Sequence, residues 1–236
     1  MKKIDLLRIE LKKHANPIKA SILQRFFKTG KGQYGEGDIF LGITVPASRK
    51  FARKYKDLNE SEIKTLLKSK IHEERLIAVL ILVHNFENGD EQIKKKIFEY
   101  YLANTAYINN WDLVDLSSDK IVGAYLFKKP KGILQKLAKS EMLWERRIAI
   151  IATFNFIKNG QSKDTFDIAK ILLNDKHDLI HKAVGWMLRE VGKRVSMEQE
   201  MDFLDKYAHK MPRTMLRYAI ERMSGPNREK YLSRVG

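Results

Sequence analysis

The chain has 236 residues, of which 44% are apolar, so it holds enough hydrophobic material for one folded domain and is too apolar to be disordered. It carries 45 Lys and Arg against 29 Asp and Glu, and the resulting net charge of +16 predicts a polyanionic partner. Cysteine is absent, which excludes a disulfide framework, a thiolate metal site and a cysteine nucleophile.

Most of the chain has the apolar periodicity of amphipathic helices. A first helix is expected to end near Asn16, and Pro17 begins a second that runs to about residue 28. A third is predicted over 46–56, and Asn59 with Glu62 forms the capping pattern that begins a fourth. Later helices are predicted over 73–86, 90–103, 109–127, 130–138, 144–158, 162–174, 178–193, 197–209 and 212–223. The short connections between them favour antiparallel helix pairs.

One segment, 29–38, interrupts the helical pattern because it holds four glycines in ten residues. Glycine at this density permits positive φ angles and tight reversals of the chain. We predict a short β-hairpin or loop insertion near 29–41. It is either a finger that touches DNA through Lys31 and Tyr34, or a passive loop.

A cation followed by small and aliphatic residues recurs along the chain every 35 or 36 residues. The recurring position holds Arg75, Trp111, Arg147, Lys182 and Arg217. This period predicts an α-solenoid of HEAT-like helix pairs, in one domain over 1–236, and in a solenoid equivalent positions line up on one surface. The cations would then form a basic column on the concave face. Alternatively, each is only the solvated edge of its own helix.

The helix predicted over 178–193 separates its apolar residues from its basic ones. The apolar face gathers Ile180, Val184, Met187, Leu188 and Val191. Lys182, Trp186, Arg189 and Lys193 share the opposite face. A tryptophan among cations suits a surface that binds a nucleic acid, where an aromatic ring packs beside bound phosphate. The alternative is that a neighbouring repeat covers Trp186.

Trp111 and Asp115 are four residues apart, so they share one face if this segment is helical. An acid on a basic surface opposes DNA binding, and it therefore needs either a cation partner or a chemical role. Asp115 is either a catalytic carboxylate or the partner of Arg147 or Lys182 in an ion pair, and the alternative role of the neighbouring Asp112 or Asn110 is to cap the helix.

Several motifs of the chain are similar to those of one known family. They are Asn16-Pro17, Phe40-Leu41-Gly42-Ile43, Trp111-Asp112-Leu113-Val114-Asp115, Trp144-Glu145-Arg146-Arg147 and the run from Lys182 to Glu190. On these motifs the chain resembles, over nearly its whole length, the DNA alkylation repair family of AlkD-like, HEAT-repeat DNA glycosylases.

The resemblance implies removal of cationic alkylated purines, such as 3-methyladenine and 7-methylguanine, from duplex DNA without a base-flipping pocket and without a cofactor. It implies that Asp115 stabilises the oxocarbenium-like transition state, with Trp111 and Trp186 packed against the lesion. Arg147 would hold phosphate, and Phe26 stands where the typical glycosylase has a tyrosine. The full set of residues expected to contact DNA is Arg147, Lys182, Arg189, Lys193, Arg75, Arg217, Phe26, Lys31 and Tyr34.

Two other classes of function stay open. Relatives with a hairpin insertion bind branched DNA without appreciable base excision, so the segment 30–38 favours a non-enzymatic binder of junctions or flaps. A helical solenoid can also bind an acidic protein. We expect a monomer in the cytoplasm, associated with the nucleoid when it binds DNA, with no membrane attachment and no metal. His177 and His181 are expected to be a solvated pair, because no third metal ligand is evident.

Overall fold

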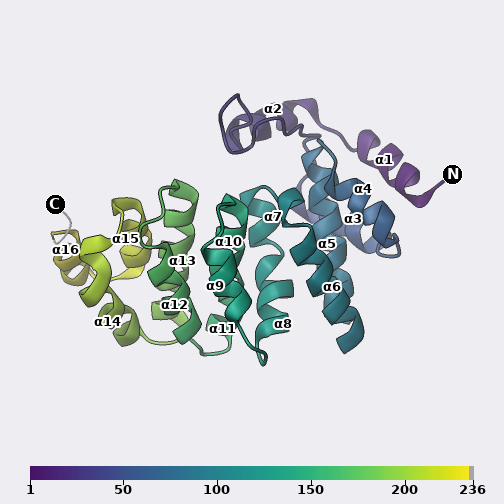
Figure 1. Cartoon of the computed structure of the whole chain (residues 1–236). Helices are drawn as coiled ribbons and strands as arrows, with labels where there is room; N and C mark the ends of the chain where they lie inside the picture. Colours follow the sequence, from purple (N-terminus) through teal and green to yellow (C-terminus); the bar gives the residue numbers. More distant parts are fainter. Residues whose placement is uncertain (234–236) are drawn as a thin grey trace. The chain divides into compact units, whose positions relative to one another are not determined.

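The computed structural model describes residues 1–233, and within this range all regular secondary structure is helical (Figure 1). This confirms the predicted all-α fold class. The chain divides into two compact units, Met1–Ser117 and a second that begins at Ser118. Each unit is a succession of helices joined by short connections, and each has its own buried apolar core.

The helices of the first unit follow the predicted pattern closely. They are α1 (Lys3–Lys13), α2 (Pro17–Phe26), α3 (Val45–Lys54), α4 (Glu60–Leu67), α5 (His72–Asn88), α6 (Glu91–Ala103), the 3-10 turn η1 (Thr105–Tyr107) and α7 (Trp111–Asp115). Helix α5 is the central element, because α3, α4, α6 and α7 all pack against it. The predicted capping pattern of Asn59 and Glu62 is confirmed, and Asn16 caps α2 by accepting from the Lys19 N–H.

In the second unit α9 packs against α10 and α12 packs against α13, and α14 and α15 follow along the chain (Figure 1). Its elements are the π-helical turn η2 (Asp119–Gly123), α8 (Ala124–Leu126), α9 (Gly132–Ala138), α10 (Leu143–Ala152), α11 (Phe154–Lys158), α12 (Lys163–Leu172), α13 (Asp178–Arg194), α14 (Met197–Tyr207), η3 (Ala208–Lys210), α15 (Arg213–Ala219), η4 (Ile220–Arg222) and α16 (Gly225–Leu232). Helix α13 is its central element, packed against α10, α12, α14 and α15.

Two helices predicted as continuous are interrupted. In the segment predicted as 109–127, the Ser117 hydroxyl donates to the Leu113 carbonyl, and such back-bonding bends helices. The chain then widens into η2, where a side chain on Gly123 would collide with the Ala152 carbonyl. The segment predicted as 144–158 breaks at Thr153, whose hydroxyl donates to Ile150. The final helix, α16, was not predicted.

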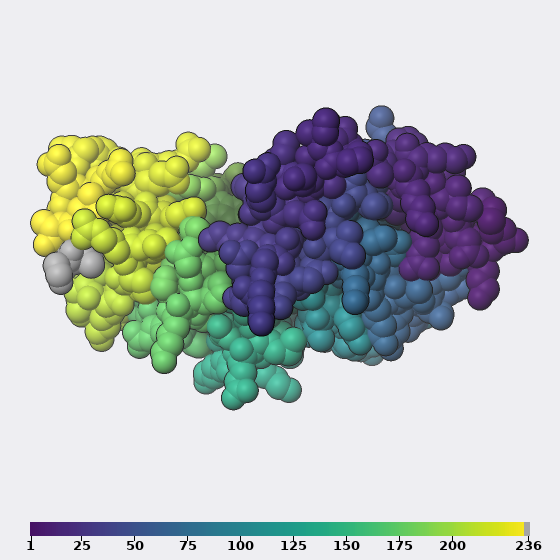
Figure 2. All heavy atoms as spheres, turned by 90° about the horizontal axis from the view of Figure 1, so that it is seen from above, coloured from purple at the N-terminus to yellow at the C-terminus, as the bar shows by residue number. Residues whose placement is uncertain are grey.

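The glycine-rich segment is a compact loop, and the predicted β-hairpin is not confirmed. No strand ladder forms within the described residues; the one β-bridge joins Ile39 to Ile71. Backbone hydrogen bonds fold the loop back on itself, and Gly35 donates to the Lys28 carbonyl at 3.2 Å. Gly32 and Gly37 have φ angles of 75° and 83°, which explains the glycine content. In Figure 2, this loop, α1 and α2 form a surface of the first unit, in purple.

The motif Phe40-Leu41-Gly42-Ile43 is the point where the glycine-rich loop is fixed to the core. The buried carboxylate of Glu73 accepts from the backbone N–H groups of Leu41, Gly42 and Ile43 at 2.8 to 3.2 Å. Gly42 has a φ of 82°, and a Cβ there would lie 2.3 Å from the Asn16 carbonyl oxygen. Only glycine therefore fits, and the motif ties α2 to α5.

A repeated turn supports the internal repeat but changes its register. Ser69, Ser140 and Asp175 each accept, through the side chain, from the N–H two residues later. In each case the basic side chain six positions on, Arg75, Arg146 or His181, donates back to the carbonyl of the first residue. Arg75 is therefore equivalent to Arg146 and His181, one residue before Arg147 and Lys182. The predicted column of equivalent cations combines two different positions of the repeat and is wrong as an alignment.

Candidate active site and nucleic-acid interface

Helix α7 contains Trp111 and Asp115, the two residues predicted from the sequence to form the centre of the site. Asn110 caps its start, with the side-chain oxygen accepting from the Trp111 N–H at 2.8 Å. Trp111 and Asp115 are the first and last residues of this single helical turn, so both project from the same side. Both residues are half-buried.

The Trp111 indole is held by two phenylalanines of the α2 end. The Phe27 ring is stacked on it, with centroids 4.9 Å apart and planes 7° apart, and Phe26 meets it edge-on at 6.0 Å. Phe27 is buried, whereas Phe26 is 62% exposed. Phe26 is thus on the surface beside Trp111, as a DNA contact requires, and Phe27 is the residue that fixes the indole plane.

A buried polar network lies directly behind Trp111, and no pattern in the sequence indicated it. Its centre is the Asp38 carboxylate, where one oxygen lies 2.7 Å from Arg75 Nη2, 3.0 Å from Asn110 Nδ2 and 3.2 Å from His72 Nδ1. The other ring nitrogen of His72 lies 2.8 Å from Asp112 Oδ2. The network joins the glycine-rich loop, α5 and α7.

The charges of this network stabilise one another. Burial raises the pKa of Asp38, but hydrogen bonding by His72 and the charge of Arg75 outweigh it and hold that pKa below its usual value. Burial lowers the pKa of His72, but the Asp112 carboxylate and the hydrogen bonds to Asp112 and Asp38 raise it above its usual value overall. The His72 ring also stacks on Phe40, with centroids 4.4 Å apart.

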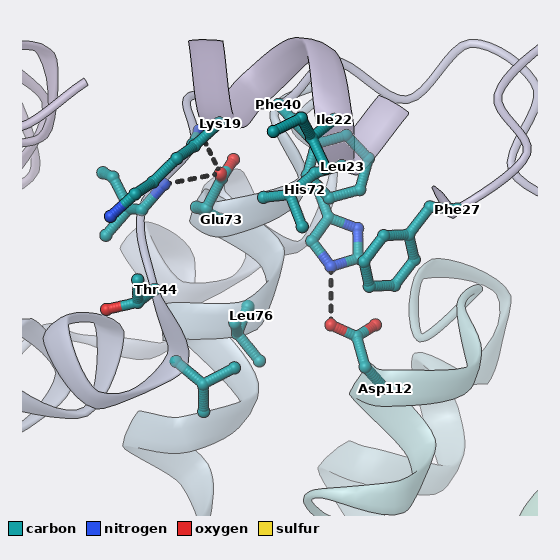
Figure 3. Close-up of a pocket in the computed structure, with 13 residues that line it drawn as sticks. Lys19, Ile22, Leu23, Phe27, Phe40, Thr44, His72, Glu73, Leu76 and Asp112 are labelled. Atoms are coloured by element: carbon teal, nitrogen blue, oxygen red, sulfur yellow. Dashed lines mark hydrogen bonds and ion pairs between the residues drawn. The ribbon is translucent and has the colours of Figure 1, made fainter. Parts of the chain in front are cut away.

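An apolar pocket of about 190 Å³ opens beside this network (Figure 3). Its walls are apolar side chains from α2 and the residue after it, from the loop before α3, from the start of α3 and from α5: Ile22, Leu23, Phe27, Phe40, Ile43, Val45 and Leu76. Lys19 and Thr44 add polar groups, and His72, Glu73 and Asp112 line it as well. In Figure 3 the imidazole of His72 lies above the Asp112 carboxylate and next to the Phe27 ring.

In the second unit, α13 has the two faces that its sequence predicts. The apolar residues Ile180, Val184, Met187, Leu188 and Val191 are all buried. On the other face Lys182, Trp186 and Arg189 are half-buried and Lys193 is exposed. The Trp186 indole packs against Phe154 with centroids 5.9 Å apart.

The cations of this face have acidic neighbours. Lys182 pairs with Asp178 at 2.7 Å, and Arg189 pairs with Glu221. Pairs at a partly exposed surface contribute little free energy, so a phosphate can compete for such a cation. Lys193 and Arg217 are exposed.

The structure places two of the predicted DNA-contacting arginines in the interior. Arg75 is 3% exposed and belongs to the Asp38 network. Arg147 is 5% exposed, and its Nη1 donates to the Leu179 carbonyl in the first turn of α13. In the glycine-rich loop, Lys31 is exposed and Tyr34 is half-buried. We therefore assign Arg75 and Arg147 to holding the elements that carry the site, and leave them out of the proposed DNA surface.

A family model described as "DNA alkylation repair enzyme" matches residues 7–223. The chain belongs to the DNA alkylation repair family. This confirms the resemblance seen in the sequence motifs and supports a role in DNA repair.

Solved structures agree with the fold of this DNA alkylation repair protein. The predicted DNA alkylation repair enzyme from Enterococcus faecalis matches with a TM-score of 0.69 and 15% identity, over 89% of this chain and 97% of that one. AlkD2 from Streptococcus mutans matches with a TM-score of 0.50 and 16% identity, over 95% of this chain and 96% of that one. At these identities the likeness shows the fold alone. No curated protein sequence matches the chain.

His177 and His181, the histidine pair noted in the sequence, both make hydrogen bonds within the protein. His177 caps α13 by accepting from the Leu179 N–H, and His181 donates to the Asp175 carbonyl. Burial lowers the pKa of His177. Across residues 1–233 there is no group of three side chains that could hold a metal ion. In the same range, no helix combines the length and apolar character needed to cross a membrane.

Proposed function

We propose that this protein is a monofunctional alkylpurine DNA glycosylase, which hydrolyses the N-glycosidic bond of cationic alkylated purines in duplex DNA. The observation that carries the proposal is the position of Trp111 and Asp115 on one turn of α7, both partly accessible, in a chain of the DNA alkylation repair family. The net charge of +16 supplies the attraction to the DNA backbone.

The chemistry needs a carboxylate and little else. In a 3-methyladenine or 7-methylguanine nucleotide the base already carries a positive charge, so it leaves without protonation when the bond from C1′ to nitrogen breaks. The bonding electron pair goes to the base, which becomes neutral, and the positive charge moves to the deoxyribose. Water then adds to C1′ and releases a proton, so the products are a free base and an abasic site.

In this proposal Asp115 faces the sugar, where its negative charge stabilises the developing oxocarbenium ion. The indole of Trp111 adds cation–π stabilisation, and the resemblance to the family assigns the same role to Trp186. Phe26 packs against the DNA next to Trp111. Phosphates are bound by cations on accessible faces, namely Lys182, Arg189, Lys193, Arg217 and Lys31. We expect a monomer acting in the cytoplasm.

The decisive experiment measures free purine bases released from N-methylated duplex DNA, with unmethylated duplex as the substrate control. The proposal predicts release of methylated purines and accumulation of abasic sites, and loss of both in Asp115→Asn. An Asp164→Asn variant is the matched control, because it changes a carboxylate of the second unit that pairs with Lys131. Release by Asp115→Asn at the wild-type rate would remove the carboxylate from the mechanism.

A second candidate is a non-enzymatic binder of branched DNA, favoured by the exposed Lys31 in a loop beside the exposed Phe26. It predicts tighter binding to four-way junctions than to linear duplex, without base release. Shortening residues 30–37 while retaining Asp38, which anchors the buried network, should abolish that preference. An unchanged preference would exclude the loop from junction recognition. A protein-binding solenoid, by contrast, predicts no useful DNA affinity at moderate salt.

A further inference from the structure

We infer that His72 is a positioning residue of the candidate site, whose imidazolium clamps the glycine-rich loop to the start of α7 and so sets the placement of Trp111 and Asp115. The inference rests on the proposed function for its effect on DNA chemistry. The clamp itself is tested separately, on the protein without DNA.

The two shortest contacts of His72 place a carboxylate oxygen against each ring nitrogen. Nδ1 lies 3.2 Å from Asp38 Oδ2, and Nε2 lies 2.8 Å from Asp112 Oδ2. A neutral imidazole has a single N–H, so it can serve one carboxylate and must turn a lone pair toward the other. Arg75 Nη2 also lies 3.5 Å from Nδ1 and would donate to it in the neutral tautomer, but the shorter contact of Nδ1 is with the Asp38 carboxylate. The imidazolium is the form that donates to both carboxylates, in a side chain that is 2% exposed.

The charges facing His72 balance only in this state. Asp38 from the loop and Asp112 from α7 supply two negative charges, and Arg75 on α5 supplies one positive charge. The imidazolium makes the buried group neutral, whereas a neutral His72 leaves one uncompensated negative charge in the interior. The carboxylate of Glu73, the next residue on α5, accepts hydrogen bonds from backbone N–H groups of the segment 41–43. From α2, Lys19 lines the adjoining pocket.

The clamp reaches the site through short connections. Asp112 directly follows Trp111 in α7, and its second oxygen accepts from the Leu113 N–H at 2.9 Å. Asn110 joins Asp38 through its amide and caps the Trp111 N–H through its oxygen. The Phe27 ring contacts both His72, at 5.0 Å, and Trp111, at 4.9 Å. A change at His72 therefore acts on both the backbone and the stacking partner of the indole.

The sign of the pH dependence follows from the raised pKa of His72. The clamp is complete below the ordinary pKa of 6.5 and is lost as the pH rises through the raised value. We expect single-turnover base release, corrected for spontaneous loss, to fall along an alkaline limb with that midpoint. Since small misplacements of reacting groups cost much rate, His72→Gln should lower release by about tenfold or more at neutral pH.

A purely structural histidine would not change the shape of the pH profile, and this separates the two roles. A glutamine side chain cannot titrate, so the His72→Gln variant should lack the alkaline limb that wild type has. His14→Gln, which changes the exposed residue that ends α1, should keep the wild-type profile. The inference would be overturned if the pH profile of base release kept its alkaline limb in His72→Gln, or if the wild-type profile had no such limb.

The clamp has a readout that needs neither DNA nor catalysis. A Trp144→Phe, Trp186→Phe protein keeps Trp111 as its single tryptophan. Its fluorescence should change with pH at the midpoint that NMR gives for the His72 ring, above 6.5. An NMR midpoint for His72 at or below pH 6.5, or a Trp111 emission that does not change at the His72 midpoint, would overturn the inference. Absence of base release from wild type, with the fluorescence transition present, would refute the glycosylase proposal and leave the clamp supported.

Discussion

The ring of Phe27 is stacked parallel to the Trp111 indole, with 4.9 Å between centroids, and so links the end of α2 to the first residue of α7. Parallel stacking fixes the plane of the indole, which an edge contact alone would leave free to tilt. The candidate catalytic aromatic is therefore positioned from outside its own short helix. The adjacent Phe26 remains 62% exposed and available to a ligand.

These adjacent phenylalanines should separate stability from binding. Phe27→Ala removes a buried ring and should lower the free energy of unfolding by about 3–5 kcal/mol, with altered Trp111 emission. Phe26→Ala should change it by less than about 0.5 kcal/mol. It should instead weaken DNA binding by about 1–3 kcal/mol, as measured by fluorescence anisotropy. Equal effects of both variants on stability would show that this division is incorrect.

Arg75 and Arg217, two arginines of the predicted basic column, should differ in their effects on stability and on DNA binding. Arg75→Met removes the arginine partner of the buried Asp38 carboxylate and leaves the network with one uncompensated negative charge, so the free energy of unfolding should fall by about 3–5 kcal/mol. Arg217→Met changes an exposed side chain, so stability should hardly change, while the slope of log affinity against log salt should fall by about 1. Denaturant titration and salt-dependent DNA binding measure the two effects. If Arg75→Met were as stable as wild type and lowered the slope of log DNA affinity against log salt, Arg75 would be a DNA contact after all.

Glu200 on α14 should make the second unit less stable at alkaline pH. It is 1% exposed, and burial raises its pKa to about 8 despite the nearby charge of Arg189. A carboxyl group whose pKa is raised on folding favours the folded state most below its unfolded value, and that stability is lost as the pH rises to the folded value. Glu200→Gln should thus be more stable than wild type at pH 8, by on the order of 1–3 kcal/mol, and equal to it near pH 4.

The exposed Glu198 of the same helix provides the control for that prediction. Glu198→Gln should follow the wild-type stability curve in urea titrations between pH 4 and pH 9. A Glu200→Gln curve parallel to that of wild type would mean that the carboxyl group ionises without cost in the folded protein.

Most helices and the two faces of α13 could be predicted from the sequence, because helical periodicity and capping are local signals. Pro17 as the start of α2, Asn59 as a cap and the apolar residues of α13 were assigned correctly for this reason. The break at Thr153 and the π-helical turn before Ala124 depend on tertiary contacts of single residues, such as Gly123 against Ala152, which no local pattern records.

The buried network was not predictable for a related physical reason. Asp38, His72 and Asp112 are far apart in the sequence and share no spacing rule, and they meet only because the loop, α5 and α7 converge. Arg75 looked like a surface cation because it begins a repeat of cation and aliphatic residues. The repeat is real, but its first basic side chain turns inward to the carbonyl of Ser69.

The most direct test is the single-turnover rate of purine release from N-methylated duplex DNA by wild type and by Asp115→Asn, with DNA affinity and thermal unfolding measured on the same preparations. Loss of a preorganised charge that stabilises the transition state should lower the rate by at least about tenfold. Affinity and unfolding temperature should remain close to those of wild type. Wild-type protein that binds methylated duplex yet releases no base, or an Asp115→Asn protein as fast as wild type, would contradict the proposed repair chemistry.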